Sequence, residues 1–280
     1  MSQHVPNVAL NDGSTIPQIG LGVYGPDDAA AAIAVSSALE VGYRLLDTAE
    51  YYGNETGVGE GVRRSGIPRE EVYLTTKLGN ESHGYDATMT AFEQSLDRLG
   101  SDYIDLYLIH WPMTKRDKYI DSWRAFESLL SDGRVRSIGV SNFQTHHLER
   151  LLSETSVVPV VNQIEVHPGH QRVAMREFNA KHSIATMAWS PLAGNPGGYG
   201  NFVDNSVVEE IGARYGKSGA QVIIRWHLQL GNIMIPKTTT PSRMVENLDV
   251  FDFRLSADEL SIIGFMENGI PNPYDPDLVD

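Results

Sequence analysis

The sequence predicts a single-domain (β/α)8 barrel of the TIM type over residues 1–280, with a β-hairpin at its N-terminus. Short apolar runs rich in strand-forming residues alternate with helical stretches along the chain, the pattern of parallel strands joined by crossover helices. Most of these runs begin about 25 to 30 residues after the previous one, a spacing that suits one strand plus one crossover helix. A chain of 280 residues can build one large core, and no linker or low-complexity segment divides this one.

The elements follow in order. Residues 8–22 predict the hairpin, two extended pieces around an Asn-Asp-Gly turn, and then a first strand near Ile19. Seven more strands are expected at residues 43–47, 72–76, 105–109, 135–140, 160–164, 184–188 and 233–235. The helical stretches between them often close on glycine, as in AAAAIAVSSALEVG, which is typical of helix C-termini. The longer interval 189–232 contains the stretch GNPGGYGN and has room for two helices.

Composition excludes several classes of function. Cysteine is absent, so the chain has no disulfide framework, thiol nucleophile or cysteine metal site. Lys and Arg number 22 against 36 Asp and Glu, and the net charge of −14 argues against a nucleic-acid partner or an anionic membrane surface. The sequence shows neither a signal peptide pattern nor an apolar run long enough to span a bilayer. We therefore expect a soluble cytoplasmic protein.

Two short motifs point to other folds. GLGVYG, residues 20–25, matches the Gly-x-Gly-x-x-Gly dinucleotide fingerprint, and Asp47 lies where its ribose acid would. A Rossmann unit is disfavoured because a hairpin with Pro17 precedes the glycines and a helix start is indicated only at Pro26. The second motif, Tyr73-x-x-x-Lys77, is the pair of short-chain dehydrogenases, which cooperates only on a helix. Residues 72–77 predict a strand instead, where this spacing separates the side chains by roughly 13 Å, so Tyr73 is expected to be a packing residue.

Nearly every predicted strand ends in a polar or aromatic side chain. The C-terminal ends of the strands of a barrel meet at one mouth, where barrel enzymes carry out their chemistry. Each residue alone has an ordinary structural explanation, such as a helix cap for Asp47, but their convergence predicts an active site. The set is Tyr24, Asp47, Lys77, His110, Ser141, Asn142, Gln163, Trp189, Ser190 and Lys237.

The stretch GYRLLDTAEYYGNE, residues 42–55, suggests acid–base chemistry. Asp47 ends a strand and Tyr52 follows five positions later. A phenol has an ordinary pKa of about 10, so Tyr52 can act as a proton donor only if a neighbour lowers that pKa. We expect Lys77, at the end of the next strand, to do so while Asp47 pairs with it.

At these residues the chain resembles the aldo-keto reductases over nearly its whole length. The resemblance is carried by GYRLLDTAEYYGNE, LTTK, DLYLIHWP, IGVSNF, NQIEVHP and IPKTTTPSRMVEN, and it is strongest to the bacterial branch of 2,5-diketo-gluconate and small aldehyde or methylglyoxal reductases. It implies a catalytic tetrad of Asp47, Tyr52, Lys77 and His110 that reduces aldehydes or ketones to alcohols. The cofactor it implies is NADPH, and no metal is needed.

The resemblance also implies which residues bind the cofactor. Ser141, Asn142 and Gln163 would hold the nicotinamide carboxamide, and Trp189 would stack on the ring. Ser190 and Leu192 would begin a pyrophosphate loop that continues through residues 193–201. The adenosine end is assigned to Lys237, Thr238, Thr239 and Arg243 at the 2′-phosphate and to Glu246 and Asn247 at the adenine.

Substrate contacts are less well defined. Tyr24 and Trp111, with Trp123 as a further candidate, are expected to form apolar walls. Lys115, Arg116 and Lys118 would either attract an acidic substrate or form a solvated loop. The tail after Phe265 is short for the family's third specificity loop. A nucleotide-binding regulatory or structural barrel with little turnover is the alternative function, and a monomer is the expected state.

Overall fold

The computed structural model describes residues 5–193, 201–268 and 275–279. Eight parallel strands form one sheet in the order β10-β9-β8-β7-β6-β5-β4-β3. Two parallel bridges, Ile19 to Met234 and Gly22 to Lys237, join its two edges and close the barrel. The strands are β3 (Leu21–Gly22), β4 (Leu45–Asp47), β5 (Tyr73–Leu78), β6 (Ile104–Ile109), β7 (Val135–Ser141), β8 (Val161–Glu165), β9 (Ala185–Trp189) and β10 (Ile233–Met234). The predicted barrel is confirmed, with strand ends shifted by a few residues.

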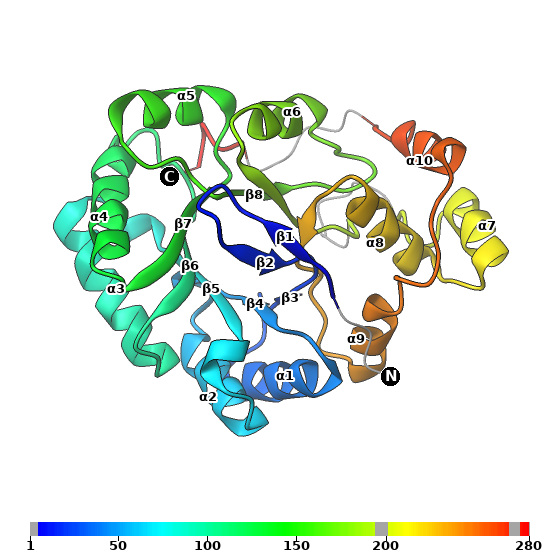
Figure 1. The fold of residues 1–280 in the computed structure, drawn as a ribbon, viewed down its shortest axis with the longest axis horizontal. Coiled ribbons are helices and arrows are strands. Elements are labelled where there is room, and N and C mark those ends of the chain that lie inside the picture. Colours follow the sequence, from blue (N-terminus) through cyan, green and yellow to red (C-terminus); the bar gives the residue numbers. More distant parts are fainter. Residues whose placement is uncertain (1–4, 194–200, 269–274, 280) are drawn as a thin grey trace.

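Helices surround the barrel (Figure 1). The two helices expected between residues 189 and 232 are present as α7 and α8. The α-helices are α1 (Asp28–Val41), α2 (Glu55–Ser65), α3 (Tyr85–Leu99), α4 (Tyr119–Ser131), α5 (Thr145–Glu154), α6 (Val173–Lys181), α7 (Ser206–Tyr215), α8 (Gly219–Gln229), α9 (Pro241–Leu248) and α10 (Ala257–Gly264), and short 3-10 helices occur at η1 (Glu50–Tyr52), η2 (Arg69–Glu71) and η3 (Asn80–Ser82). None of these helices is long and apolar enough to cross a membrane.

The glycines of GLGVYG serve barrel closure. A Cβ atom on Gly22 would lie 2.8 Å from the carbonyl oxygen of Ile235, and one on Gly20 would lie 2.4 Å from Cγ of Leu45. The helix after the motif begins only at Asp28, capped by the side chain of Asp27. The glycines therefore allow close strand approach in a barrel, and the Rossmann interpretation is wrong. Tyr73 begins strand β5 and packs against the core, as expected for a strand.

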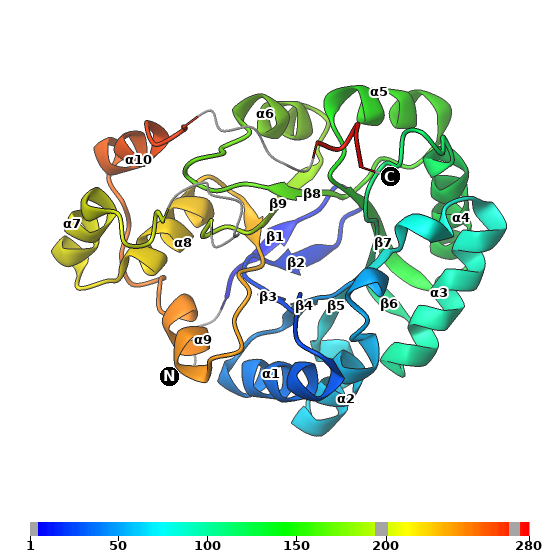
Figure 2. The same ribbon diagram turned by 180° about the vertical axis from the view of Figure 1, so that it is seen from behind.

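The N-terminal hairpin covers one end of the barrel. Strands β1 (Asn7–Ala9) and β2 (Thr15–Pro17) pair antiparallel, and Figure 1 shows them in front of the barrel strands. Leu10 and Ile16 pack into one cluster with the barrel-interior residues Leu45, Leu106 and Met187. The hairpin thus fills the N-terminal end with apolar side chains, and Figure 2 views the molecule from the opposite side, where the strands end.

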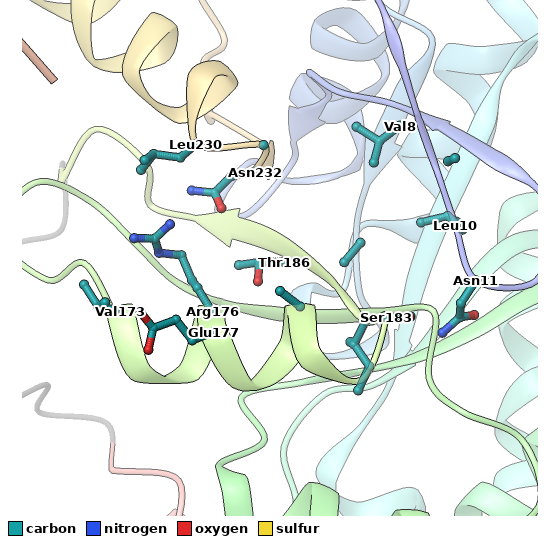
Figure 3. Close-up of a pocket in the computed structure, with 15 residues that line it drawn as sticks. Val8, Leu10, Asn11, Val173, Arg176, Glu177, Ser183, Thr186, Leu230 and Asn232 are labelled. Atoms are coloured by element: carbon teal, nitrogen blue, oxygen red, sulfur yellow. The ribbon is translucent and has the colours of Figure 1, made fainter. Parts of the chain in front are cut away.

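A hollow of about 570 Å³ lies beside the hairpin, bordered by α6 and the segments that lead into β9 and β10 (Figure 3). The ionisable residues that line it are Arg176 and Glu177. Arg176 donates from Nε to the carbonyl oxygen of Gln171 at 2.9 Å. The residues with the predicted chemistry lie elsewhere, at the C-terminal mouth.

Candidate active site

A cavity of about 620 Å³ opens at the C-terminal mouth of the barrel. It is lined by strand ends and by the loops that follow them, as predicted. Among the predicted residues, those that line it are Tyr24, Asp47, Tyr52, His110, Trp111, Ser141, Asn142, Gln163, Trp189, Ser190 and Lys237. Residues far apart in the sequence therefore meet at one site.

Lys77 lies beneath this cavity and is fully buried. Its Nζ donates to Oδ1 of Asp47 at 2.5 Å and to the carbonyl oxygen of Thr48 at 2.8 Å. It also lies 3.4 Å from the hydroxyl of Tyr52. The other oxygen of Asp47, Oδ2, accepts from Nε2 of Gln163 at 2.7 Å. These contacts place a cation against the phenol and satisfy both oxygens of the buried carboxylate.

The local sequence explains how Tyr52 reaches this position. After β4 the chain turns through the short helix η1, which ends at Gly53 with a φ of 65°. Asn54 fixes the turn, because its Oδ1 accepts from Thr48 Oγ1 at 2.8 Å and its Nδ2 donates to the carbonyl oxygen of Val23 at 2.7 Å. Glu55 is buried and accepts from Nε of Arg98 at 2.7 Å. The Asn and Glu of the motif therefore hold the loop that presents the tyrosine.

The pKa of Tyr52 differs from the prediction. Burial raises the pKa of the phenol above its ordinary value, and the charge of Lys77 lowers it only in part. The expected net lowering is wrong for this structure, because removing the phenolate from water outweighs the attraction of one cation. Burial alone would lower the pKa of Lys77, but Asp47 and Tyr52 raise it, so the ammonium keeps its proton. Lys77 does lower the pKa of Tyr52 relative to burial alone, and this effect is the one that proton donation needs. Tyr52 is protonated at neutral pH, and the cation offsets part of the cost of forming the phenolate.

His110 forms the neighbouring wall. Its ring packs edge-on against that of Tyr52, with centroids 5.7 Å apart. Burial, with a smaller effect of Lys77, lowers the pKa of His110 well below its ordinary value, so the imidazole is neutral. A neutral imidazole carries one N–H and can donate a hydrogen bond to a carbonyl oxygen.

The residues expected at the nicotinamide form one hydrogen-bonded network. Ser141 donates from Oγ to the carbonyl oxygen of Gln163 at 3.0 Å. The amide of Asn142 donates to the carbonyl oxygen of His110 at 3.0 Å and accepts from Nε1 of Trp189 at 2.9 Å. Asn142 has a φ of 62° and Ser190 a φ of 47°, an uncommon conformation for such residues. Trp189 is thus fixed at the cavity wall.

The residues expected at the adenosine end follow one another along the chain. Lys237 is exposed and lines the cavity, and Arg243 is exposed in the first turn of α9. Glu246 accepts a hydrogen bond from Oγ of Ser218, and Asn247 is buried. Thr238, Thr239, Arg243, Glu246, Asn247 and Leu192 do not line the cavity itself. The predicted loop 193–201 lies, apart from Ala193 and Asn201, outside the described residues.

Two of the proposed substrate walls are in place and one is not. Tyr24 is 58% exposed and packs edge-on against Tyr52, with centroids 5.0 Å apart. Trp111 lines the cavity. Trp123 is fully buried and donates from Nε1 to the carbonyl oxygen of Val157 at 3.2 Å, so it is a core residue and that prediction is wrong. Arg116 contacts the carboxylate of Glu81 at 2.5 Å.

Several residues at the cavity were missed. Glu50 and Tyr51 are in the same 3-10 helix as Tyr52, and Glu81 lies four residues beyond Lys77. The signal in the sequence that could have found these residues is that they lie within a few positions of Tyr52 or Lys77. Val279 also lines the cavity, and no feature of the tail indicated this.

The tail reaches the site because Asp277 is held at the start of α5. Its Oδ1 lies 3.0 Å from Nε2 of His146 and 3.0 Å from Nε2 of His147, and its Oδ2 accepts from Gln144 at 3.3 Å. This His–His–Asp set has a spacing that could suit a metal ion. However, Nδ1 of His147 accepts from the backbone N–H of Gln144 at 3.0 Å, which leaves the proton of the neutral ring on Nε2. A metal ion at Nε2 would therefore have to displace that proton, whereas the contacts seen here hold the tail against α5.

Comparison with known proteins decides the family. The family model described as "Aldo/keto reductase family" matches residues 18–265. The chain belongs to the aldo/keto reductase family. This aldo/keto reductase is 50% identical over 264 residues to an aldo-keto reductase of Mycolicibacterium smegmatis, covering 94% of each chain. It is 47% identical over 270 residues to methylglyoxal reductase DkgA of Escherichia coli, covering 96% of each.

The chain is also similar to a solved structure. A mutant of Gox0644 in complex with NADPH superposes with a TM-score of 0.93 at 45% identity, covering 99% of each chain. The resemblance read from the motifs is therefore confirmed over the whole barrel, and the chain is an enzyme of this family.

Proposed function

We propose that this reductase converts aldehydes or ketones to alcohols with NADPH, with Tyr52 as the proton donor. The observation that carries the proposal is the buried set in which Nζ of Lys77 lies 2.5 Å from Asp47 and 3.4 Å from the hydroxyl of Tyr52. The set faces a cavity of about 620 Å³ that is large enough for a small substrate and part of a cofactor. The relative DkgA is named a methylglyoxal reductase, and a mutant of Gox0644 was solved in complex with NADPH.

The side chains at the cavity fit a nicotinamide cofactor, which would supply the hydride that no side chain can. Ser141, Asn142 and Trp189 belong to one network at the wall, where amide and hydroxyl groups can orient a carboxamide and an indole can stack on a ring. Lys237 and Arg243 would bind the 2′-phosphate. Arg243 suits that role because its planar guanidinium can bind phosphate oxygens in pairs.

The protein's own groups account for polarising and protonating the carbonyl. Tyr52 and His110 would both donate hydrogen bonds to the substrate oxygen, so that negative charge developing there is stabilised. Tyr52 then transfers its proton to that oxygen. The ammonium of Lys77 stabilises the phenolate left behind, and Asp47 keeps the ammonium in place. Proton transfer is thus completed without a metal ion.

The decisive experiment compares wild type with Tyr52→Phe, following the loss of NADPH absorbance with methylglyoxal and an aromatic aldehyde. Removing a general acid typically costs about 10²- to 10⁴-fold in rate, and we expect a loss of kcat in that range. Binding of NADPH, titrated by fluorescence, should change by less than about threefold, because the hydroxyl serves the substrate oxygen. Tyr85→Phe is the matched control, since Tyr85 lies on α3 and donates to Ser128 at 3.0 Å.

Two outcomes would contradict the proposal. If Tyr52→Phe kept more than a tenth of the wild-type kcat, Tyr52 would not be the acid. If wild type bound NADPH and reduced no carbonyl compound, the chain would be a nucleotide-binding regulatory barrel.

A further inference from the structure

Glu50 places a carboxylate in the wall of the active-site cavity, two residues before Tyr52. Its Oε2 accepts from the backbone N–H of Gly79 at 2.8 Å, and its Oε1 accepts from Oγ of Ser82 at 3.1 Å. These two contacts fix the direction of the carboxylate. A carboxylate has about four acceptor positions, so capacity remains for a donor in the cavity.

Gly79 makes this arrangement possible. A Cβ atom at position 79 would lie 2.8 Å from Oε2 and 2.9 Å from Cδ of Glu50. Any side chain there would displace the carboxylate or cover it. Because position 79 is a glycine, the acidic group remains part of the wall.

The other charged side chains at the cavity either have an ion-pair partner or lie at the end assigned to the cofactor phosphate. Among the described lining residues, the carboxylate and ammonium side chains are those of Asp47, Glu50, Glu81 and Lys237. Asp47 is paired with Lys77 and Glu81 with Arg116, each at 2.5 Å. Lys237 pairs through its backbone with Gly22 across the barrel seam, at the end assigned to the cofactor phosphate. In the described part of the chain, Glu50 has no ion-pair partner at this cavity.

We propose that Glu50 is a specificity-determining residue that makes the enzyme favour uncharged carbonyl substrates with an O–H or N–H donor over substrates that carry a carboxylate. The proposal rests on the carbonyl reductase function above. A substrate carboxylate in the cavity would meet a second anion, and like charges repel more strongly beside a protein wall than in bulk water. A hydroxyl or amide N–H would instead donate to Glu50, a charge-assisted hydrogen bond that is stronger than a neutral one.

The test uses two aldehydes of nearly the same size and shape, 4-formylbenzamide and 4-formylbenzoate. Wild type should favour the amide in kcat/KM by about tenfold or more, because bringing like charges together at a binding site is costly on at least that scale. Glu50→Gln keeps an acceptor for Gly79 but removes the charge. It should reduce the preference by about fivefold or more, mainly through a lower KM for the benzoate.

Glu70→Gln is the matched control, because Glu70 is exposed in η2 and does not line the cavity. Glu70→Gln also removes one negative charge from the molecule, but that charge lies away from the cavity. The ratio of kcat/KM for the amide to kcat/KM for the benzoate should therefore equal that of wild type. If Glu50→Gln does not fold, Glu50→Ala takes its place. A wild-type ratio near one, or a ratio that both Glu50 variants leave unchanged, overturns the inference. Failure of wild type to oxidise NADPH with either aldehyde and with methylglyoxal contradicts the proposed function instead.

Discussion

At the scale of single residues, the buried ammonium of Lys77 is surrounded by oxygen atoms of Asp47, Thr48 and Tyr52. A charge removed from water this completely is tolerated only when it is paired and hydrogen-bonded. Lys77 therefore has two roles that experiment can separate: it neutralises Asp47 in the folded state, and it offsets part of the cost of forming a phenolate at Tyr52.

Lys77→Met should lose both roles. The double variant Asp47→Asn/Lys77→Met has no charge at position 47 to neutralise, so it should lose only the effect on Tyr52. Leaving one partner of a buried ion pair alone costs roughly 3–5 kcal/mol of unfolding free energy. Removing the charge of Asp47 as well should recover much of that loss. Both variants should have little turnover, because burial raises the pKa of Tyr52 and no cation opposes that change. Urea unfolding and kcat measure the two effects, and a double variant within tenfold of wild-type kcat would contradict the role of Lys77.

The sequence predicted individual residues well where a strand end fixes their place, and poorly where burial decides. Asp47, Lys77 and His110 could be located because each follows an apolar run that ends at the barrel mouth. The net direction of the pKa change at Tyr52 could not be predicted, because it depends on how completely the phenol is buried. The assignment of Trp123 to the substrate wall failed for a related reason: an indole in an amphipathic helix can face the cavity or the core, and only packing distinguishes them.

At the scale of elements, the segment from β10 to α9 would carry the cofactor's charged end. Lys237 follows β10, and α9 begins at Pro241 with Arg243 exposed in its first turn. Proline at this position is favourable because the first N–H groups of a helix have no partner within it. Those free N–H groups and the helix dipole favour an anion nearby, so the cations here are in suitable surroundings for a phosphate.

Arg243→Ala should weaken NADPH binding by about 10- to 100-fold, the range expected for losing one charge-assisted phosphate contact of about 1.5–3 kcal/mol. NADH binding should change little, because NADH lacks the 2′-phosphate. Fluorescence titration with both cofactors measures the ratio, with Arg124→Ala as the control, since Arg124 pairs with Asp121 on α4. Unchanged NADPH affinity would show that the phosphate is bound elsewhere.

The order of elements was predictable because each strand has an apolar run and a turn or helix signal after it. Three features could not be read in this way. The shape of η1, which turns Tyr52 towards Lys77, depends on contacts of Asn54 with residues of other segments. The approach of Gly22 to Ile235 depends on closing the barrel. The position of Val279 depends on the contacts of Asp277 with α5. All three result from tertiary contacts that no local pattern records.

At the scale of the whole molecule, closure of the barrel buries histidines as well as apolar residues. His227 on α8 is fully buried, with Nε2 donating to the carbonyl oxygen of Pro191 at 3.1 Å and Nδ1 facing Nδ2 of Asn232 at 3.1 Å. Both ring nitrogens thus have partners suited to the neutral ring. Since Pro191 follows Trp189 and Ser190, the same contacts link α8 to the active-site wall.

These histidines predict how stability depends on pH. Burial is the largest cause that lowers the pKa of His227 from 6.5 to about 3 and those of His83 and His167 to about 4. Below about pH 6.5 the unfolded chain therefore binds protons that the folded chain does not bind. The stability that these neutral rings contribute is fully present above pH 6.5 and is lost as the pH falls through their folded pKa values, about 4 for His83 and His167 and about 3 for His227. Each such group contributes about 1.4 kcal/mol per pH unit within its window. Calorimetry from pH 7.5 to 4.5 should show a falling Tm. The slope of the unfolding free energy against pH should be shallower in His227→Gln than in wild type, by about one proton per molecule. An equal slope in wild type and variant would mean that His227 is protonated in the folded protein over this range, against the burial seen here.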